Sequence, residues 1–532
     1  MTVLPEWLLP LPDAELMRAI DRWAIQEQGV DSLELMERAG SGVAAATERL
    51  APDGPVSVVC GKGNNGGDGL VVARLLRHAG RPVTVVLLAD PSELSGDARA
   101  NLERLPGPAP VRLDGGAWDD TGAATASGGP LPGTGAGAVI VDAILGTGFA
   151  GEPRGTAAAA IEAINGAGAA VVSVDVPSGV DSSSGVVAGA AVTASLTVTF
   201  HVAKPGLWIN PGKSHTGTLV TLDIGIPRGA PMEATVGLIR AAVLGLLPRR
   251  TASWTKFRSG QVLVVGGSRG LSGAPAMAAR AAMRAGAGYV TACVPSSLQA
   301  VLAAGGTPEM MTRGMPEDAD GGLAADALEP VLDAAARGGA LALGPGLGRA
   351  EGSFAFARRL AHTAKTPMVI DADALNAHAG RLGELAGREG PAVLTPHAGE
   401  LARLLGLDSA EIERRRLEHV REAARQAQAV VVLKGDDSLV AASDGRVAVS
   451  PGATPALATA GTGDVLTGVI AALLAQGLDP FPAAAAGVHI HAEAGKEAAR
   501  RLGAVEGVIA SDVIAALPAA RARGEEGEGR DA

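Results

Sequence analysis

Two features of this sequence could take part in chemistry: glycine-rich turns, and acidic side chains next to short apolar runs. In the segment 458–468, Ala460 to Gly463 precede Asp464 and an apolar stretch at helical spacing. Backbone N–H groups at the start of a helix lack partners within it, and small side chains let an anionic oxygen approach them. A carboxylate beside such an anion hole can take a proton from a hydroxyl that attacks a phosphoryl group. We therefore interpret Asp464 as a candidate base; the alternative is a helix cap after a Gly-rich turn.

A second glycine-rich segment follows an early strand-like run. Residues 56–60 (VSVVC) lead into 61–69 (GKGNNGGDG), and 70–79 predict a helix. A glycine motif between a strand and a helix is typical of nucleotide binding, although this spacing is not the usual G-x-G-x-x-G. Asn64 and Asn65 offer amide oxygens that suit an ion or a nicotinamide carboxamide. The alternative is that both asparagines only form left-handed turns.

Two further strands of this half end in aspartate. Residues 139–142 end in Asp142 before a Gly-Thr-Gly loop, and residues 170–174 precede Asp175 and a Pro-Ser-Gly turn. The carboxyl ends of the strands of a parallel α/β sheet meet at one edge, and ligands bind there. Either aspartate alone would most simply cap a helix. The two together with the Asn-Asn segment favour a binding site.

The second half alternates strand-like and helix-like runs, which predicts a mainly parallel sheet covered by helices on both faces. His397 lies in a Thr-Pro-His turn, where we favour a ligand contact over a structural role. Lys434, expected to be exposed at a strand end, could reach a phosphate or be a solvated surface lysine. Asp371 and Asp373 could hold Mg²⁺ through water or cap the next helix. The same alternation predicts that residues 252–532 fold alone.

Composition limits the classes of protein to consider. The 532 residues carry a net charge of -11 and 2% aromatic residues, which argues against nucleic acid as a partner. Cys60 and Cys293 are interpreted as small buried hydrophobic residues. We recognise no secretory signal and no bilayer-spanning run, and expect a soluble cytoplasmic enzyme with no membrane partner. Residues 114–137 are expected to form a mobile surface loop, and 524–532 a disordered tail.

The ordered set of motifs resembles one family over nearly the whole chain. The first half is similar to the epimerase of the bifunctional NAD(P)H-hydrate repair enzymes, through GNNGGDG (63–69), DAILGTG (142–148) and DVPSG (175–179). The second half is similar to their dehydratase, through GPGLG (344–348), DADALN (371–376), LTPHAGE (394–400), KG (434–435) and ATAGTGDVL (458–466). The resemblance implies an α/β protein with a Rossmann-like three-layer domain over 1–230, a ribokinase-like α/β domain over 231–523 and a tail over 524–532.

The resemblance also implies the reactions. Hydrated NADH or NADPH exists as R and S epimers at the hydrated ring carbon. The first domain would interconvert these epimers, and the second would dehydrate the S epimer with ADP, giving NAD(P)H, AMP and phosphate. K⁺ is the implied cofactor of the epimerase, and Mg²⁺ with ADP as co-substrate is implied for the dehydratase. A homo-oligomer is also expected.

Carried over residue by residue, the family motifs imply the site residues. In the first domain Asp175 would be catalytic and contact the hydrate, and the K⁺ ligands would be Asn65, Asp142 and Ser178. The other implied hydrate contacts there are Asn64, Asn65, Gly66, Gly67, Asp68, Gly146, Thr147, Gly148, Phe149, Ala150, Gly151 and Glu152. In the second domain Asp464 would be catalytic and would contact the hydrate with Ala274, Gly346 and His397. The implied nucleotide contacts are Lys434, Gly435, Asp436, Asp437, Ser438 and Gly463.

Two other functions stay open from the residues alone. The same anion hole and aspartate would serve an ATP-dependent small-molecule hydroxyl kinase of ribokinase type, with an N-terminal nucleotide-binding module. Alternatively, the first domain only senses a nucleotide or scaffolds a partner. Recovery of NADH from its hydrate with ADP would exclude the kinase. Loss of catalysis on substitution of Asp175 would exclude the scaffold.

Overall fold

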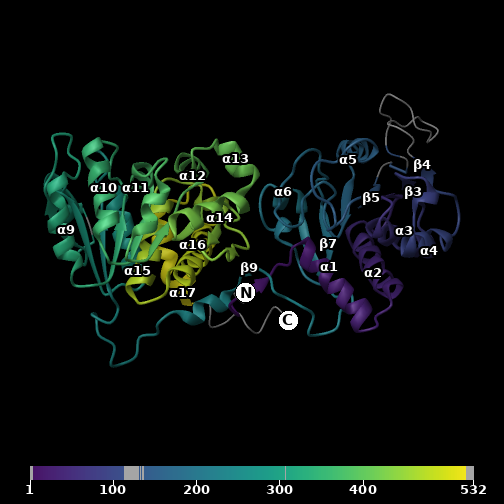
Figure 1. Ribbon diagram of the computed structural model, residues 1–532, viewed down its shortest axis with the longest axis horizontal. Coiled ribbons are helices and arrows are strands. Elements are labelled where there is room, and N and C mark those ends of the chain that lie inside the picture. Colours follow the sequence, from purple (N-terminus) through teal and green to yellow (C-terminus); the bar gives the residue numbers. More distant parts are fainter. Residues whose placement is uncertain (1–3, 113–130, 132, 135–136, 306, 523–532) are drawn as a thin grey trace. The chain divides into compact units, whose positions relative to one another are not determined.

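The computed structural model describes residues 4–112, 131, 133–134, 137–305 and 307–522, and these form two compact units (Figure 1). Unit 1 comprises Pro10–Thr235. Unit 2 comprises Val236 onward together with the start of the chain, described from residue 4 to residue 9. The predicted loop over 114–137, apart from 131, 133–134 and 137, and the predicted tail lie outside the described residues. No helix in the described ranges is long and apolar enough to cross a membrane.

Unit 1 is built on one parallel sheet. Within the described residues its strand order is β4-β3-β2-β5-β6-β7-β8, and every neighbouring pair is parallel. The strands are β2 (Val56–Cys60), β3 (Val83–Leu87), β4 (Val111–Arg112), β5 (Val139–Ala143), β6 (Ala170–Val174), β7 (Leu196–Phe200) and β8 (Thr218–Leu222). The chain runs outward from β2 to one side and from β5 to the other, so their carboxyl ends form a topological switch point.

Helices cover both faces of this sheet and make it a three-layer unit. They are α1 (Ala14–Arg22), α2 (Ser32–Leu50), α3 (Asn64–His78), α4 (Gly96–Glu103), α5 (Thr156–Gly166) and the short α6 (Gly212–Thr216). Val58 and Cys60 of β2 pack with residues of α2 and α3, whereas Val59 between them packs with Ile161 and Ile164 of α5. This alternation is expected of a strand buried on both faces.

The glycine-rich segment after β2 is helical, which corrects the expected helix start at residue 70. Helix α3 begins at Asn64. A Cβ on Gly66 would lie 1.9 Å from the carbonyl oxygen of Gly61, and one on Gly69 would lie 2.6 Å from Cβ of Ala143. These glycines therefore let the helix start against the strand ends rather than form a loop.

Unit 2 contains a longer sheet. Its order within the described residues is β1-β9-β18-β17-β16-β15-β14-β13-β10-β11-β12, with β17 antiparallel to both of its neighbours. The strands are β1 (Leu8–Pro10), β9 (Val236–Ile239), β10 (Gln261–Val265), β11 (Tyr289–Pro295), β12 (Met311–Met315), β13 (Ala340–Leu343), β14 (Met368–Ile370), β15 (Ala392–Leu394), β16 (Val430–Leu433), β17 (Leu439–Ala441) and β18 (Val447–Val449). The switch point lies between β10 and β13.

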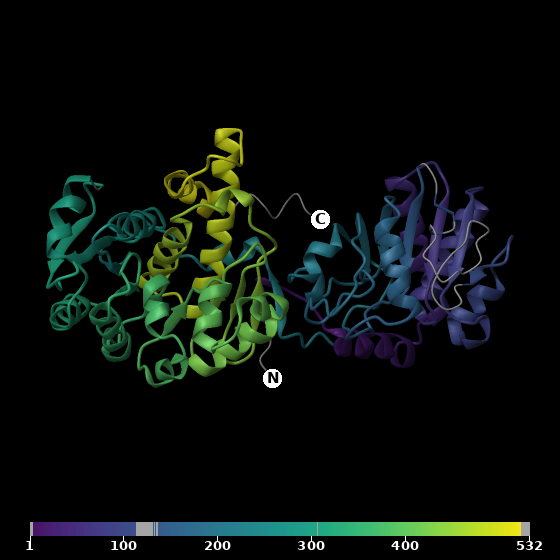
Figure 2. The same ribbon diagram turned by 90° about the horizontal axis from the view of Figure 1, so that it is seen from above.

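The helices of unit 2 pack on both faces, so the predicted α/β class is confirmed for both halves. They are α7 (Gly273–Arg284), α8 (Ser296–Gly305), α9 (Leu328–Ala335), α10 (Glu351–Thr363), α11 (Ala372–Ala377), α12 (Ala398–Leu405), α13 (Ser409–Arg414), α14 (Arg416–Ala427), α15 (Thr462–Ala475), α16 (Pro480–Leu502) and α17 (Ala510–Ala522). Val262 and Val264 share a core with α7 and α15 to α17, the last three drawn in yellow tones in Figures 1 and 2. Helices α9 and α14 also pack on the sheet.

The first strand of the chain belongs to the sheet of unit 2. Strand β1 pairs with β9, so a segment that the sequence places in the first domain completes the second unit instead. Trp7 and Leu8 are buried in the unit 2 core, and the Trp7 ring lies 5.6 Å from that of Phe481 in α16. A Cβ on Gly237 would lie 2.8 Å from Cβ of Leu8, so glycine is needed for this close approach. Residues 234–250 therefore contain β9, a strand of the unit 2 sheet.

Candidate active sites

A cavity of about 890 Å³ lies at the switch point of unit 1. Its walls come from α1, α2, the start of α3, and the loops that follow β3, β5, β6 and β7. Gly63, Asn64 and Asn65 line it where α3 begins. No side chain caps the first N–H groups of this helix, so they are free to receive an anionic group.

Asp175 lies in this cavity and is paired with a residue that sequence reasoning missed. Lys204 Nζ lies 2.6 Å from Asp175 Oδ1, and its side chain is only 1% exposed. The hydroxyl of Thr199 also donates to Oδ1 at 3.2 Å, and the Thr147 N–H donates to Oδ2 at 3.2 Å. Burial alone would raise the pKa of Asp175, but the charge and hydrogen bond of Lys204 bring it below its usual value. Asp175 has a φ of 65°, a strained conformation for a residue with a Cβ and one that clusters at functional sites.

Asp68 lies on α3 and also lines the cavity. Its side chain has no hydrogen-bond or ion-pair partner among the described residues, although the residue is only 8% exposed. Burial, followed by the charges of Asp175, Asp21 and Asp97, raises the pKa of Asp68 well above its usual value. This carboxyl therefore holds a proton more strongly than the paired Asp175 does.

The three residues expected to hold K⁺ lie at the same edge of the sheet, Asn65 in the first turn of α3, Asp142 in β5 and Ser178 in the loop after β6. The carboxylate of Asp142 accepts hydrogen bonds from the hydroxyl of Ser178 at 2.5 Å, its N–H at 2.9 Å and the hydroxyl of Ser173 at 2.8 Å. Burial raises the pKa of Asp142, and no cationic side chain contacts it among the described residues. The amide nitrogen of Asn65 is buried there without a partner.

The remaining predicted hydrate contacts of unit 1 divide into two groups. Asn64, Asn65, Asp68, Asp175 and Gly146 to Phe149 line the cavity. Gly66 and Gly67 do not line it, because Gly66 packs against the backbone of Gly61 and Gly67 against Met36. Ala150, Gly151 and Glu152 also lie outside its lining, and all three are exposed.

In unit 2, Asp464 lies in the first turn of α15, as the sequence predicts. Gly461 precedes this turn in a left-handed conformation with φ 90°, and no side chain caps the helix. A Cβ on Gly461 would lie 2.6 Å from Sδ of Met277, so a larger residue would disturb the turn. Burial first, then the charges of Asp371 and Asp373, raise the pKa of Asp464 to about 7, against the opposing effect of Lys434. A carboxyl with this pKa exchanges protons readily near neutral pH.

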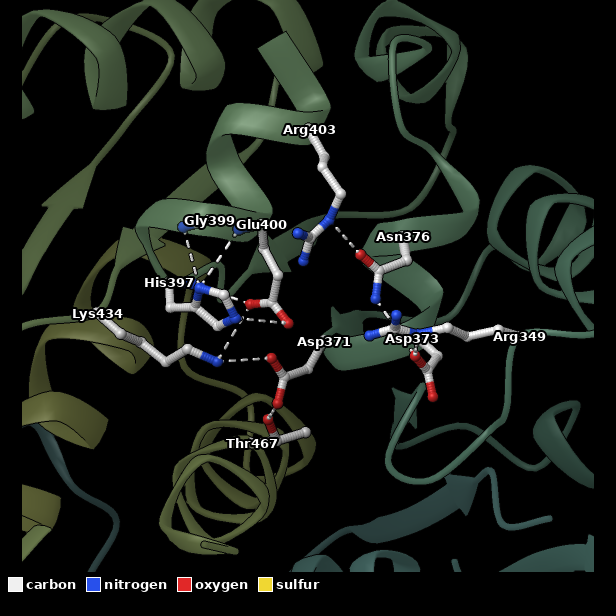
Figure 3. A network of polar contacts seen from close by, with 10 residues as sticks. All are labelled: Arg349, Asp371, Asp373, Asn376, His397, Gly399, Glu400, Arg403, Lys434 and Thr467. Atoms are coloured by element: carbon white, nitrogen blue, oxygen red, sulfur yellow. Dashed lines mark hydrogen bonds and ion pairs between the residues drawn. The ribbon is translucent and has the colours of Figure 1, made fainter. Parts of the chain in front are cut away.

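The charged residues that act on Asp464, namely Asp371, Asp373 and Lys434, belong to a network of polar contacts that Figure 3 shows. Lys434 follows β16, and its Nζ lies 3.0 Å from Oδ1 of Asp371 and 3.7 Å from Oε2 of Glu400. The hydroxyl of Thr467 in α15 donates to the other oxygen of Asp371 at 2.6 Å. The expectation that Lys434 is exposed is wrong, since its side chain is 21% exposed and reaches inward to Asp371. The ion pair with Asp371 holds the ammonium of Lys434 inside the site.

His397 forms the N-cap of α12. Its Nδ1 accepts hydrogen bonds from the backbone N–H groups of Gly399 at 3.0 Å and Glu400 at 3.3 Å. The backbone N–H of His397 donates to Oε2 of Glu400 at 2.9 Å. Burial lowers the pKa of His397 even though the nearby Glu400 opposes this effect. The other ring nitrogen, Nε2, lies 3.5 Å from Oε1 of Glu400, and the side chain of His397 is 55% exposed.

Asp373 is held by other protein groups in the same view. It accepts hydrogen bonds from Nε of Arg349 at 3.2 Å and Nδ2 of Asn376 at 3.2 Å, both drawn in Figure 3. The N–H of Gly348 also donates to Asp373 at 3.1 Å. Nε of Arg403 donates to Asn376 Oδ1 at 2.8 Å. Asp371 occupies the N-cap position of α11, but its side chain makes no capping hydrogen bond to that helix. The alternative that the Asp371 side chain caps the helix is therefore wrong.

The loop 434–438, expected to bind the nucleotide, is fixed by a buried ion pair. Arg416 Nη2 lies 2.9 Å from Oδ1 of Asp437, with side chains 2% and 1% exposed. The same guanidinium donates to the carbonyl of Lys434 at 3.3 Å. The carboxylate of Asp437 is thus used to position the loop. Gly435 and Ser438 close it, since the Ser438 hydroxyl donates to the Gly435 carbonyl at 2.7 Å.

The other predicted residues of unit 2 lie around these groups. A Cβ on Gly463 would be 3.6 Å from Nζ of Lys434, so this glycine faces the ammonium. A Cβ on Gly346 would be 3.2 Å from Cβ of Ala274, which places these two residues side by side at the switch point. Asp436 accepts a hydrogen bond from the N–H of Ala453 at 3.2 Å, which ties loop 434–438 to the turn before α15.

Two family models match the chain, one in each unit. Residues 32–206 match a model described as the YjeF-related protein N-terminus, and residues 262–519 match one described as NAD(P)H-hydrate dehydratase. A bifunctional NAD(P)H-hydrate repair enzyme from Moorella thermoacetica is 44% identical and covers 96% of this chain and 96% of its own length. One from Salinibacter ruber is 43% identical, with coverages of 98% and 97%. The chain belongs to the family of bifunctional NAD(P)H-hydrate repair enzymes.

One of the similar solved structures covers about half of this chain. It is an ADP/ATP-dependent NAD(P)H-hydrate dehydratase from Bacillus subtilis, co-crystallised with ATP and Mg²⁺. It is 31% identical, covers 53% of this chain and 96% of its own, and has a TM-score of 0.45.

Several site residues of this repair-enzyme family member carry no local sequence signal. Lys204 and Arg416 are basic residues that chain position alone does not connect with Asp175 and Asp437. Glu400 could have been found, because a Glu three residues after His397 is a capping-box spacing. The carboxylates of Asp371 and Asp373, expected as possible Mg²⁺ ligands, both accept hydrogen bonds from protein donors. This arrangement argues against Mg²⁺ binding by these two residues. Among the described residues, no group of three or more His, Cys, Asp or Glu could hold a metal ion.

Proposed function

We propose that unit 1 interconverts the R and S epimers of hydrated NAD(P)H and that unit 2 dehydrates the S epimer with ADP. Membership of the repair-enzyme family supports both assignments. The observation that carries the proposal is Asp464, with a pKa raised to about 7, beside the uncapped start of α15 and the ammonium of Lys434. These are the groups that transfer of a phosphoryl group to a hydroxyl requires.

Dehydration follows from making the hydroxyl a better leaving group. Asp464 takes the hydroxyl proton as the hydroxyl oxygen attacks the terminal phosphorus of ADP, and AMP leaves. The N–H groups at the start of α15 and the ammonium of Lys434 stabilise the phosphoryl oxygens. The C–O bond of the phosphorylated ring then breaks with loss of phosphate, and a proton leaves the adjacent carbon. The ring is thereby restored to NAD(P)H.

Loop 434–438 would hold the nucleotide. Its backbone is fixed from behind by Arg416 and Asp437, so it is already ordered before the nucleotide arrives. His397 and the paired Ala274 and Gly346 would contact the hydrate. Mg²⁺ would accompany the phosphates of the nucleotide, since Asp371 is bound to Lys434 and Thr467 and offers no ready ligand.

Epimerisation requires the hydroxyl to leave one face of the ring and return to the other. The ring nitrogen of dihydronicotinamide donates electrons into the ring, so water adds to the carbon next to that nitrogen. If only the hydroxyl leaves, with its bonding electron pair, and the hydrogen added to the neighbouring carbon stays, the ring becomes a cation with a C=N bond, which an anionic site stabilises. Asp175 is held as a carboxylate by Lys204 at the cavity wall and would serve this role.

K⁺ suits the oxygen groups of Asn65, Asp142 and Ser178. Asp142 is a buried carboxylate with hydroxyl and N–H partners but no cationic side chain among the described residues. A monovalent cation bound there would supply the missing positive charge and order the loops around the cavity. Replacing K⁺ by tetramethylammonium should lower the melting temperature of wild type and slow epimerisation. An Asp142→Asn variant should lose this dependence of melting temperature, and equal stability of wild type in both salts would contradict the assignment.

The proposed function is tested with the full chain, a mixture of both NADH-hydrate epimers and ADP. Complete recovery of NADH absorbance at a rate above that of spontaneous epimerisation supports both activities. Fast recovery of the S fraction followed by a slow phase at the spontaneous rate would exclude the epimerase activity, and no recovery would exclude the dehydratase activity. A kinase that stops after phosphorylation would consume nucleotide without restoring NADH. Light scattering of the same sample tests the expected homo-oligomer.

A further inference from the structure

The cavity of unit 1 contains a buried carboxyl group, that of Asp68, without a cationic partner among the described residues. Asp68 lies five residues after Gly63 on α3, is 8% exposed and lines the cavity. No hydrogen bond or ion pair to its side chain exists within the part of the chain that the structure describes. Buried carboxylates without partners are costly, so such a group is either protonated or waiting for a ligand.

The charges around Asp68 favour the protonated form. Asp21 of α1, Asp97 of α4 and Asp175 of the loop after β6 face it with negative charge. Lys204 is the cation nearest to Asp175, but its ammonium is bound to Oδ1 of that residue and to the carbonyl of Phe200 at 3.0 Å. The Cys60 thiol nearby is also buried, which raises its pKa, so it contributes no charge.

The proposed epimerisation has one chemical need that Asp175 does not meet. Hydroxide is a poor leaving group, and an acid must give it a proton as the C–O bond breaks. Asp175 cannot be this acid, because its pairing with Lys204 holds its pKa below the usual value. Two carboxyl groups with environments that separate their pKa values are the usual arrangement for an acid and a stabilising anion in one site.

We propose that the carboxyl group of Asp68 is the acid that protonates the departing hydroxyl of the hydrate during epimerisation. The proposal rests on the epimerase function assigned to unit 1. The C–O bond breaks with its electron pair on oxygen, the proton of Asp68 converts the leaving group to water, and the nitrogen lone pair forms the C=N bond. Water then adds to the opposite face, and the proton that it loses returns to the Asp68 carboxylate through water in the cavity.

The decisive variant is Asp68→Asn, which keeps the size of the side chain and removes the proton donor. Its epimerisation rate should fall by a factor on the order of 10²–10⁴, while dehydration of the pure S epimer by the same protein stays normal. Asp53→Asn, an exposed substitution in the same unit, is the matched control and should leave both rates unchanged. The epimerisation kcat/KM of wild type should fall as pH rises through the raised pKa of Asp68, whose acidic neighbours are Asp21, Asp97 and Asp175.

The outcomes separate this proposal from the function on which it rests. Fast epimerisation by wild type with an equally fast Asp68→Asn variant overturns the role of Asp68 alone. Absence of accelerated epimerisation by wild type overturns the epimerase assignment and the role together. A wild-type measurement in isotopically labelled water removes any dependence on folding of the variant. The epimerised product should carry oxygen from solvent, and retention of the original oxygen would overturn the proposal.

Discussion

The ammonium of Lys434 lies 3.0 Å from Oδ1 of Asp371, and this pair connects the ends of β16 and β14 at the floor of the unit 2 site. Burial alone would lower the pKa of Lys434, but the charges of Asp371 and Glu400 raise it above its usual value. The lysine therefore stays charged beside Asp464. It can stabilise phosphoryl oxygens and also limits how far the pKa of Asp464 rises.

Lys434→Met should reduce dehydration by a factor on the order of 10²–10³, the usual cost of removing one electrostatic donor from an active site. It also leaves Asp371 buried without its cation, at a cost of about 3–5 kcal/mol in stability. The double variant Lys434→Met, Asp371→Asn should recover stability but not activity. Lys496→Met on the exposed side of α16 is the control. If the double variant recovers both, Lys434 has only a structural role.

Dehydration should depend on the protonation of Asp464. As the candidate base it must be deprotonated, so kcat/KM should rise with pH through about 7. Asp464→Asn should lose a factor on the order of 10²–10⁴ in dehydration while epimerisation continues. Asp479→Asn, which changes an exposed Asp before α16, is the matched control. Near-normal dehydration by Asp464→Asn would contradict a role of Asp464 as the base and leave it only the role of a side chain in the first turn of α15.

The same pKa has an effect on stability with a defined sign. Because the folded-state pKa of Asp464 is raised, the folded protein binds this proton more tightly than the unfolded chain does. Asp464 therefore lowers stability progressively as pH rises from about 4, the ordinary Asp value, to about 7, its folded-state pKa. The melting temperature of Asp464→Asn relative to wild type should increase across that interval. A constant difference would mean that the carboxyl is not desolvated.

Much of this arrangement could be predicted from local patterns. Asp142 and Asp175 follow apolar runs, and the edge rule for parallel sheets brings them together, whereas Asp464 precedes an apolar run at helical spacing. The partners Lys204 and Arg416 could not be placed, because each contact depends on where a distant loop returns in three dimensions. The helical state of 64–69 could not be predicted either, since six residues with three glycines favour a turn locally until strand packing is considered.

The position of β1 shows another limit of local reasoning. Nothing in residues 4–9 indicates pairing with β9, more than two hundred residues away in the chain. A fragment that starts at residue 252 lacks both strands of this sheet. The βα pattern alone is therefore a weak basis for the prediction that this fragment folds by itself. Trp7→Ala should destabilise unit 2 by about 3–5 kcal/mol, seen as a lower melting temperature of the ADP-responsive transition. Leu9→Ala, at a 44% exposed position on the same strand, should have little effect. Equal shifts for the two variants would contradict a core role for Trp7.

The division of labour between the units is tested through Asp175. Asp175→Asn removes the carboxylate that would stabilise the cationic ring, so epimerisation should become slow while the S epimer is still repaired with ADP at the normal rate. Repair of a mixture of epimers should then be biphasic, with a slow phase at the uncatalysed rate. Because the substitution leaves Lys204 buried without its partner, Asp175→Asn with Lys204→Met is needed as a folding control. Single-phase repair of mixed epimers by a folded Asp175→Asn variant would remove Asp175 from the mechanism.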